Sequence, residues 1–405
     1  MHSWLQKEMK IKSRPDDFVV EEFLTLPEFL PSGEYVIYGL EKRGLSTLEV
    51  VNRLVHKYKI CDREINFAGI KDKYALTSQY LSIRGKRLKE IKEKNFALTP
   101  LGRAVRPVGP DLLTKNKFTI TLRSLDRTHI PVLINSLSEI SRWGFPNYFG
   151  EQRFGSARHG EGFLAKHLVL GDFEGALKLY LASWSSEDRA VVKEFKKFVS
   201  DHWGSWEECL RVAPRSNERS VLAYLKDHPR DFLKAVNLIN PRMLSLYIAA
   251  YQSYLWNEMA SEFIRLNLSE NELIKFAYVA GEMVFYKTLP ENLFHEFRRI
   301  KIPLVDSKVE FPAGKIGEIA ERVINGEGVA IGDFRLNKIK RAFFKSVLRE
   351  LIAFPKELEI SDPAPDEIYS HKFKITISFF LYSGTYATVP LRRIQVEEGA
   401  EFPSG

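Results

Sequence analysis

Two segments far apart in the 405-residue chain carry the alternation of a half-buried β-strand. Lys117–Arg123 and Lys372–Leu381 each alternate large apolar side chains with lysine, threonine or other polar residues, so each has one apolar face. From about residue 157 the pattern changes to the spacing of three and four that is typical of helices, most clearly from Asn240-Pro241 through Leu266. A strand needs partner strands, so the sequence predicts a helical block inserted into a sheet-containing α+β domain.

Further elements are expected on either side of this change in pattern. Ser46–Tyr58 is a predicted amphipathic helix whose Ser46 and Glu49 have the spacing of a capping box. Another helix is expected between Pro131 and Gly144. Short strands are expected at residues 64–70 and 79–83, and helices at residues 163–181, 187–199 and 231–239.

Composition indicates a globular protein whose positive charge favours a polyanionic partner but does not require one, since many soluble proteins are mildly basic. The net charge is +8 and the sequence pI is about 9.1, which favours encounter with nucleic acid without identifying which one. The two cysteines, Cys61 and Cys209, are far apart, so neither a disulfide framework nor a cysteine zinc site is expected. Because the N-terminus lacks the apolar core of a signal peptide and no apolar run reaches membrane-spanning length, we expect a soluble, cytoplasmic protein without a membrane partner.

Several cofactor motifs are missing from the sequence. There is no G-x-x-x-x-G-K-[ST] segment, no G-x-G-x-x-G after a predicted strand, and no zinc deaminase signature. We therefore expect chemistry that needs neither a metal nor an organic cofactor.

Three polar loops rich in aromatic residues carry the candidate chemistry, at residues 12–22, 67–79 and 146–155. In the second loop Asp72 lies between two lysines, whose positive charge favours an ionised carboxylate. An ionised aspartate on a basic surface is suited to act on RNA, although an aspartate in this setting is also typical of a solvated turn. The third loop combines glycines, aromatic rings and an arginine, a set that can bind a base and a phosphate or can simply anchor the loop to the core.

Together, in this order, these loops resemble those of the TruD family of pseudouridine synthases. Its segments P-E-D-F-x-V-x-E, G-x-K-D-x-x-A-x-T-x-Q and N-Y-F-G-x-Q-R-F-G correspond to residues 15–22, 69–79 and 147–155, with a mild departure at Asp16. Residues 250–257 and 383–388 agree as well, so the resemblance spans nearly the whole chain.

The resemblance implies cofactor-independent isomerisation of uridine to pseudouridine in tRNA, typically at uridine 13 of the D arm. It implies that Asp72 is the catalytic carboxylate, which attacks C1′ or removes a proton from C2′, and that Lys12 pairs with it. Phe149 corresponds to the aromatic residue that stacks on the flipped-out base, and Asn147 to a neighbouring polar residue. Phe18 and Tyr386 correspond to further aromatic positions near the pocket, although some members have phenylalanine at the second. Four residues are candidate phosphate contacts in an RNA site between two domains: Lys71, Lys73, Arg153 and Arg158.

The resemblance also implies the architecture. A pseudouridine synthase catalytic domain with a mixed, largely antiparallel sheet is expected at residues 1–157 and 341–405, and a helix-rich α/β TRUD domain is expected to be inserted at residues 158–340. We expect a monomer that binds tRNA. The alternatives are a noncatalytic tRNA-binding or tRNA-folding chaperone on the same scaffold and a transglycosylase, which would need an exchange base and other motifs.

Overall fold

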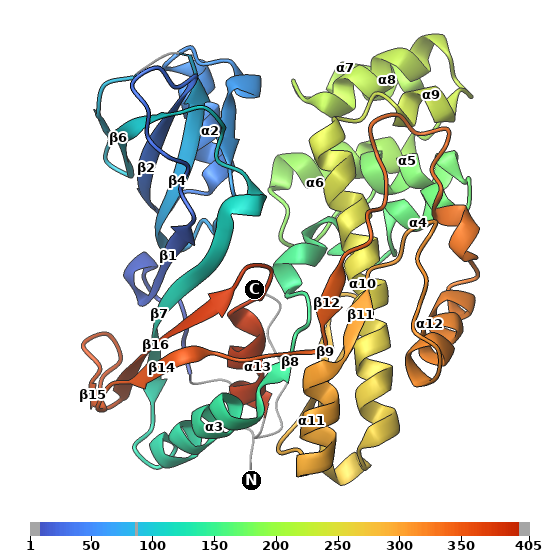
Figure 1. Cartoon of the computed structure of the whole chain (residues 1–405). Coiled ribbons are helices and arrows are strands. Elements are labelled where there is room, and N and C mark those ends of the chain that lie inside the picture. The colour runs from blue at the N-terminus through green and yellow to red at the C-terminus, as the bar shows by residue number, and fades with distance from the viewer. Residues whose placement is uncertain (1–8, 86–87, 397–405) are drawn as a thin grey trace. The chain divides into compact units, whose positions relative to one another are not determined.

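The computed structural model describes residues 9–85 and 88–396 and divides into two compact units. Of the described residues, the first unit contains those up to Gly144 and again from Phe354 to Val396, and the second contains Phe145–Ala353. The chain thus leaves a sheet-containing unit, forms a second unit rich in helices and returns (Figure 1). The domain boundaries expected at residues 157/158 and 340/341 stay a prediction.

The first unit is built around one mixed sheet, which has ten strands among the described residues. Its main path runs β14-β16-β7-β1-β4-β2-β6-β5, with β15 beside β16 and β3 beside β4. Neighbouring strands are antiparallel except for β1 and β4, which run parallel. The strands are β1 (Phe18–Leu24), β2 (Tyr35–Arg43), β3 (Ile65–Phe67), β4 (Leu76–Arg84), β5 (Ile91–Lys92), β6 (Phe96–Ala104), β7 (Leu113–Leu125), β14 (Lys356–Ile360), β15 (Ala364–Pro365) and β16 (Phe373–Tyr382).

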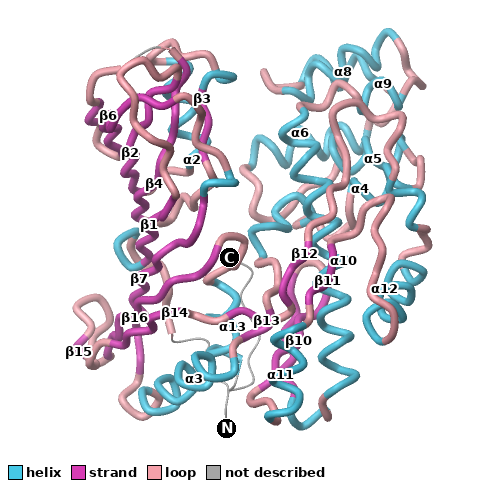
Figure 2. The backbone as a smooth tube through the Cα atoms, viewed as in Figure 1, coloured by secondary structure: helices cyan, strands magenta, loops and turns pink. Residues whose placement is uncertain are grey.

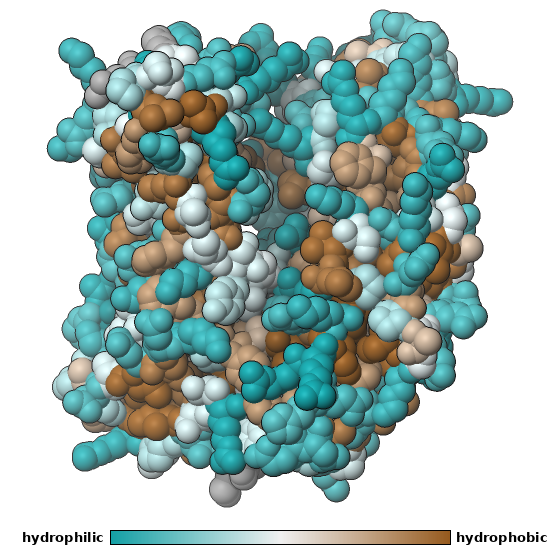
Figure 3. Space-filling view, in the orientation of Figure 1, coloured by the Kyte–Doolittle hydropathy of each residue, from teal (hydrophilic) through white to brown (hydrophobic). Residues whose placement is uncertain are grey.

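The two distant segments that were expected to be half-buried strands are β7 and β16, and the structure pairs them side by side in the sheet (Figure 1). The apolar side chains of both strands form one buried face: Phe118, Ile120, Leu122, Ile375, Ile377 and Phe379. In the space-filling view, hydrophobic side chains also reach the surface over the region of β14 and β16 (Figure 3).

Three α-helices lie in the described part of the first unit: α2 (Thr47–His56), α3 (Ile130–Trp143) and α13 (Thr388–Val396). The capping box of α2 is confirmed, because the hydroxyl of Ser46 accepts from the Glu49 amide at 3.2 Å and the Ser46 amide donates to the Glu49 carboxylate at 2.7 Å. Gly144 ends α3 with a φ of 72°, which favours glycine.

Helices dominate the second unit, and its described strands form three two-stranded sheets (Figure 2). The helices are α4 (Leu164–Val169), α5 (Phe173–Leu181), α6 (Ala190–Asp201), α7 (Trp206–Val212), α8 (Asn217–Asp227), α9 (Phe232–Val236), α10 (Pro241–Asn267), α11 (Glu291–Arg299) and α12 (Lys315–Gly326). The strands are β8 (Phe145–Pro146), β9 (Leu273–Tyr278), β10 (Gly281–Tyr286), β11 (Lys301–Pro303), β12 (Leu348–Glu350) and β13 (Ile352–Ala353).

The long helix α10 is the element against which much of the second unit packs. Its start is the predicted one, because the side chain of Asn240 caps the helix by accepting from the Arg242 amide at 2.9 Å. Helices α4 and α12 and strands β10 and β11 pack against it.

The range 163–181 is helical as expected, but it is divided between two helices, α4 and α5. Gly171 interrupts it with a φ of 73°, and Asp172 caps the second helix by accepting from the Gly175 amide at 2.8 Å. The strand expected at residues 64–70 is limited to β3.

Candidate active site

An ion pair joins Lys12 and Asp72, the two residues that the family resemblance implies are catalytic. The ammonium of Lys12 lies 2.8 Å from Oδ2 of Asp72, and each side chain keeps between a fifth and a quarter of its surface exposed. Lys12 precedes β1 and Asp72 precedes β4, and these neighbouring strands run parallel. Segments that lead into neighbouring parallel strands meet at the same edge of a sheet, so the topology brings together residues separated by 60 positions.

The aromatic ring of Phe18 contacts the ammonium group of Lys12. The Lys12 ammonium lies 4.2 Å from the centroid of the Phe18 ring, within the range of a cation–π contact. The ring is buried and packs edge-on against Phe118, with centroids 6.2 Å apart. Lys12 itself has a φ of 63°, which is unusual for a residue other than glycine, so its backbone conformation is held by these surroundings.

A buried polar network holds the loop that carries Asp72. The amide of Lys71 donates to the Thr47 hydroxyl at 2.8 Å, and this hydroxyl donates to Oε1 of Gln79, also at 2.8 Å. The Gln79 amide in turn donates to the carbonyl of Gly69 at 3.2 Å. The glutamine that ends the recognised segment therefore braces the loop at a buried position.

Lys71 does not fit its expected role as a phosphate contact. Its side chain is 9% exposed, and its ammonium pairs with Glu22 at 2.8 Å and donates to Oδ1 of Asn116 at 2.7 Å. The neighbouring Lys73 is exposed and pairs with Glu49 at 2.8 Å. Of the two lysines that flank Asp72, one therefore points into the unit and one lies at the surface.

Sequence reasoning missed Lys42, a buried lysine at the end of β2. Its ammonium donates to the carbonyl oxygens of Leu45 and Asp72, both at 2.7 Å, and to that of Lys71 at 3.4 Å. Burial lowers the pKa of Lys42 to about 8, although the charge of Asp72 opposes this shift. The signal was present in the sequence, since Lys42 continues the buried alternation of Val36, Tyr38 and Leu40.

The acidic residue before Phe18 has a structural role. Asp17 is buried and pairs with Arg123 of β7 at 2.8 Å, and Arg123 also contacts Asp366 at 2.9 Å and Glu367 at 3.0 Å. Burial alone would lower the pKa of Arg123, but the three carboxylates raise it above its ordinary value. This cluster anchors the start of β1, and with it the segment that follows Lys12.

A second cluster of predicted site residues lies in the second unit. Asn147 is buried, and its side chain accepts from the Arg349 guanidinium at 2.8 Å and donates to the carbonyl of Glu350 at 3.1 Å. Phe149 is 7% exposed, and its backbone is held on both sides by Asn257, which accepts from its amide at 2.9 Å and donates to its carbonyl at 3.1 Å.

Arg349 is the second residue that sequence reasoning missed. Its guanidinium carbon lies 4.0 Å from the centroid of the Phe149 ring and 5.1 Å from that of Trp256. It also donates to the backbone carbonyls of Asn147 at 2.7 Å and Tyr148 at 3.3 Å. Arg153 approaches the same ring at 5.6 Å, whereas Arg158 pairs with Glu187. An arginine about 200 positions from its partners carries no local pattern that would reveal it.

Tyr386 belongs to the first unit and lies between β16 and α13. It is half-buried, and its carbonyl accepts from the Val389 amide at 3.1 Å. Its expected role beside the pocket for the flipped-out base stays a prediction.

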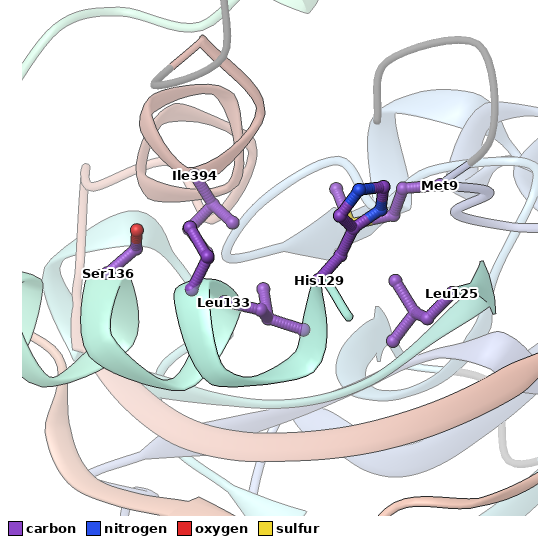
Figure 4. Close-up of a pocket in the computed structure, with 7 residues that line it drawn as sticks. Met9, Leu125, His129, Leu133, Ser136 and Ile394 are labelled. Atoms are coloured by element: carbon purple, nitrogen blue, oxygen red, sulfur yellow. The ribbon is translucent and has the colours of Figure 1, made fainter. Parts of the chain in front are cut away.

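A separate pocket in the first unit lies between α3 and α13 (Figure 4). Its lining is mostly apolar and includes Met9, Leu125 and Ile394 together with His129. None of the predicted site residues lines it, so it is not a candidate active site.

The described ranges hold neither a candidate metal centre nor a candidate membrane-spanning helix. These ranges contain no group of three or more His, Cys, Asp and Glu side chains arranged as metal ligands. Among the described helices, none combines the length and the hydropathy that a membrane crossing requires.

Comparison with known proteins places these features in one family. The family described as tRNA pseudouridine synthase D (TruD) matches residues 5–394. The chain is 32% identical over 391 residues to the Methanocaldococcus jannaschii protein named "Probable tRNA pseudouridine synthase D 2", covering 95% of this chain and 91% of the relative. It is 28% identical over 396 residues to the tRNA pseudouridine synthase D of Aquifex aeolicus, covering 96% and 98%.

A solved structure supports the same assignment. The crystal structure of a Methanosarcina mazei protein assigned to TruD superposes with a TM-score of 0.68 at 28% identity, covering 96% of this chain and 93% of that one. The expected α+β fold with a mixed, largely antiparallel sheet is thereby confirmed.

Proposed function

Because the chain belongs to the tRNA pseudouridine synthase D family, we propose that it isomerises uridine to pseudouridine in tRNA with Asp72 as the catalytic carboxylate. The observation that carries the proposal is the ion pair between Lys12 and Asp72 at 2.8 Å. A merely solvated turn would not need a lysine 60 positions away, held by a cation–π contact and a left-handed backbone.

The reaction rearranges bonds within one nucleotide. The C1′–N1 bond of uridine breaks, the uracil turns, and a C1′–C5 bond forms while the proton on C5 is lost and N1 gains one. Asp72 either attacks C1′ or removes the proton on C2′, and both routes begin with an ionised carboxylate. Lys12 supplies the positive charge that stabilises this form, while the exposed part of Asp72 remains open to the substrate.

The target is proposed to be uridine 13 in the D arm, the site typical of the family. A base stacked inside folded tRNA must be flipped out, at a cost of a few kcal/mol. We assign Phe149 to stacking on this base and Asn147 to its polar contacts, with Phe18 and Tyr386 as further aromatic neighbours. Arg153 and the exposed Lys73 are assigned to the phosphate backbone.

The test compares wild type with Asp72→Asn and Asp72→Ala on unmodified tRNA transcripts. Pseudouridine is mapped by carbodiimide-dependent stops in primer extension, and tRNA binding is measured in parallel. We expect wild type to modify one D-arm uridine. Both variants should still bind tRNA, but their rate of pseudouridine formation should be at least about 100-fold lower.

Two outcomes would overturn parts of the proposal. Wild type that binds tRNA and leaves every uridine unchanged would favour a noncatalytic chaperone. An active enzyme whose Asp72→Asn variant keeps the wild-type rate would remove Asp72 from the chemistry while leaving the activity in place.

A further inference from the structure

Asp72 is bonded at two points by two different lysines. Lys12 pairs with its carboxylate, and Lys42 donates to its backbone carbonyl oxygen at 2.7 Å. The two contacts have different physical consequences. The first acts on the charge of the side chain, and the second restrains the position of the main chain from which that side chain extends.

The surroundings of Lys42 are those of a buried ammonium with a specific set of acceptors. The residue is 1% exposed, and its ammonium contacts the carbonyl oxygens of Leu45, Lys71 and Asp72. An ammonium has three N–H donors, and three carbonyl oxygens surround this one. Leu45 belongs to the turn between β2 and α2, so Lys42 ties that turn to the loop that carries Asp72.

If packing were the only requirement at this position, a buried lysine would be less favourable than an apolar side chain. Burying a charge costs free energy that good geometry only partly returns, and an apolar side chain would continue the pattern of β2. The ammonium provides what an apolar side chain cannot, because it holds two successive backbone carbonyls, those of Lys71 and Asp72, in a fixed position.

We propose that Lys42 is a positioning residue for catalysis, which fixes the backbone of Lys71 and Asp72 so that the Asp72 carboxylate is held in its reactive orientation. This inference rests on the proposed function, in which Asp72 is the catalytic group. It assigns to Lys42 no contact with the substrate.

Because Lys42 restrains the loop through its ammonium, the rate of the reaction should depend on the protonation of Lys42. The charged groups that face Lys42 are Asp72, Lys71 and Glu49, and each has a partner of its own in Lys12, Glu22 and Lys73 respectively. The pKa of Lys42 is lowered to about 8, so its charge is present below this pH and is lost above it. A neutral amine has two N–H donors for three carbonyl oxygens, so the loop loses one restraint as the pH rises through about 8.

The first experiment separates positioning from folding. Lys42→Met is compared with Leu40→Ala, a variant of the same buried face of β2 whose side chain belongs to the apolar core. Under single-turnover conditions we expect Lys42→Met to react about 100-fold more slowly with its Kd for tRNA changed by less than about threefold, because a small displacement of a catalytic group has effects of this size. Leu40→Ala should lower the melting temperature and leave the rate per folded molecule unchanged. A folded Lys42→Met variant that reacts within about twofold of wild type would overturn the proposal.

The second experiment follows the rate against pH. Wild type should lose activity with a midpoint near pH 8, and Lys42→Arg, whose side chain stays charged, should not show this midpoint. An active Lys42→Arg variant with the midpoint of wild type would count against the proposal. If the larger guanidinium abolishes activity at every pH, the methionine variant and the exchange measurement below decide.

The third measurement does not depend on activity. Hydrogen exchange of the backbone amides in residues 70–74 should be at least about tenfold faster in Lys42→Met than in wild type, and unchanged in Leu40→Ala. Unchanged exchange in Lys42→Met would overturn the positioning role. Faster exchange in a protein whose wild type forms no pseudouridine would instead refute the proposed function and leave the restraint of the loop in place.

Discussion

Individual residues of the candidate site differ in how they are held. Lys12 has a strained backbone conformation, a cation–π contact with Phe18 and an ion pair with Asp72. Phe149 is packed under the guanidinium of Arg349. In both cases an aromatic ring and a cation lie in contact, one pair in each unit. Residues fixed in this way need little rearrangement before they act, which is how preorganised sites reduce the barrier.

The first prediction for an individual residue concerns the charge of Lys12. Lys12→Met should lower the single-turnover rate by about 10- to 100-fold, because a partly buried Asp72 carboxylate then lacks its counter-charge. Lys12→Arg should recover part of the loss, since it keeps the charge. Rates of the two variants are compared at saturating enzyme. Equal rates for Lys12→Met and wild type would show that the ion pair has no catalytic role.

The second prediction concerns stacking by Phe149. Phe149→Leu keeps an apolar side chain of similar size in the core but removes the ring, so we expect a loss of about 1–3 kcal/mol in capture of the flipped base. It is measured as a single-turnover rate lower by about 5- to 150-fold, with the melting temperature as control. A variant with the wild-type rate would remove Phe149 from base recognition.

At the scale of elements, the sheet is anchored by charge as well as by its apolar face. Arg123 on β7 binds Asp17 before β1 and Asp366 before β16. Burial alone would raise the pKa of Asp366, but the N–H groups of Ser124, Ile368 and Tyr369 and the guanidinium of Arg123 lower it below its ordinary value. The cluster thus joins β1, β7 and β16 beside the segment that carries Lys12.

Removing Arg123 should therefore destabilise the first unit and change its response to acid. We expect Arg123→Met to lower the free energy of unfolding by about 3–5 kcal/mol at pH 7, because it leaves buried carboxylates without a partner. The pKa of Asp366 is lower in the folded protein than in the unfolded chain. The stabilisation that its ionised carboxylate contributes is therefore complete above the unfolded-state pKa and is lost as the pH falls through the folded-state pKa.

Denaturant unfolding between pH 3 and 7 tests both parts of this prediction. Wild type should lose stability steeply below about pH 4, and Arg123→Met should start lower and lose less over the same range. Parallel curves for the two proteins would contradict the role assigned to this cluster.

A smaller effect is expected at the start of α2. Ser46→Ala should cost about 1 kcal/mol of stability, because the Glu49 amide loses its acceptor, and Ser46→Asp should retain most of it. Hydrogen exchange within α2 provides the measurement. Equal protection in Ser46→Ala and wild type would indicate that the cap contributes nothing.

For the whole molecule, the net charge of +8 is the property that bears most directly on tRNA binding. The affinity for tRNA should fall by at least about tenfold between 50 and 200 mM salt, because bound counterions are released from the phosphates. Asp72→Ala should follow the same slope, since Asp72 is not assigned to the backbone. An affinity independent of salt would argue against an electrostatic RNA interface.

Local pattern and tertiary structure contributed different parts of this picture. The sequence was sufficient to predict the half-buried strands β7 and β16, the caps of α2 and α10, and the family resemblance, because alternation, capping and motifs are properties of neighbouring residues. The tertiary structure decided which strands pair and how Lys12 reaches Asp72, a partner that the family resemblance already implied, since the contact depends on β1 and β4 running parallel. It also decided that Lys71 turns inward and that Lys42 and Arg349 hold the candidate residues. These contacts join positions far apart in the chain, and a side chain's partners across a sheet or beside a long helix are set by packing rather than by its neighbours in sequence.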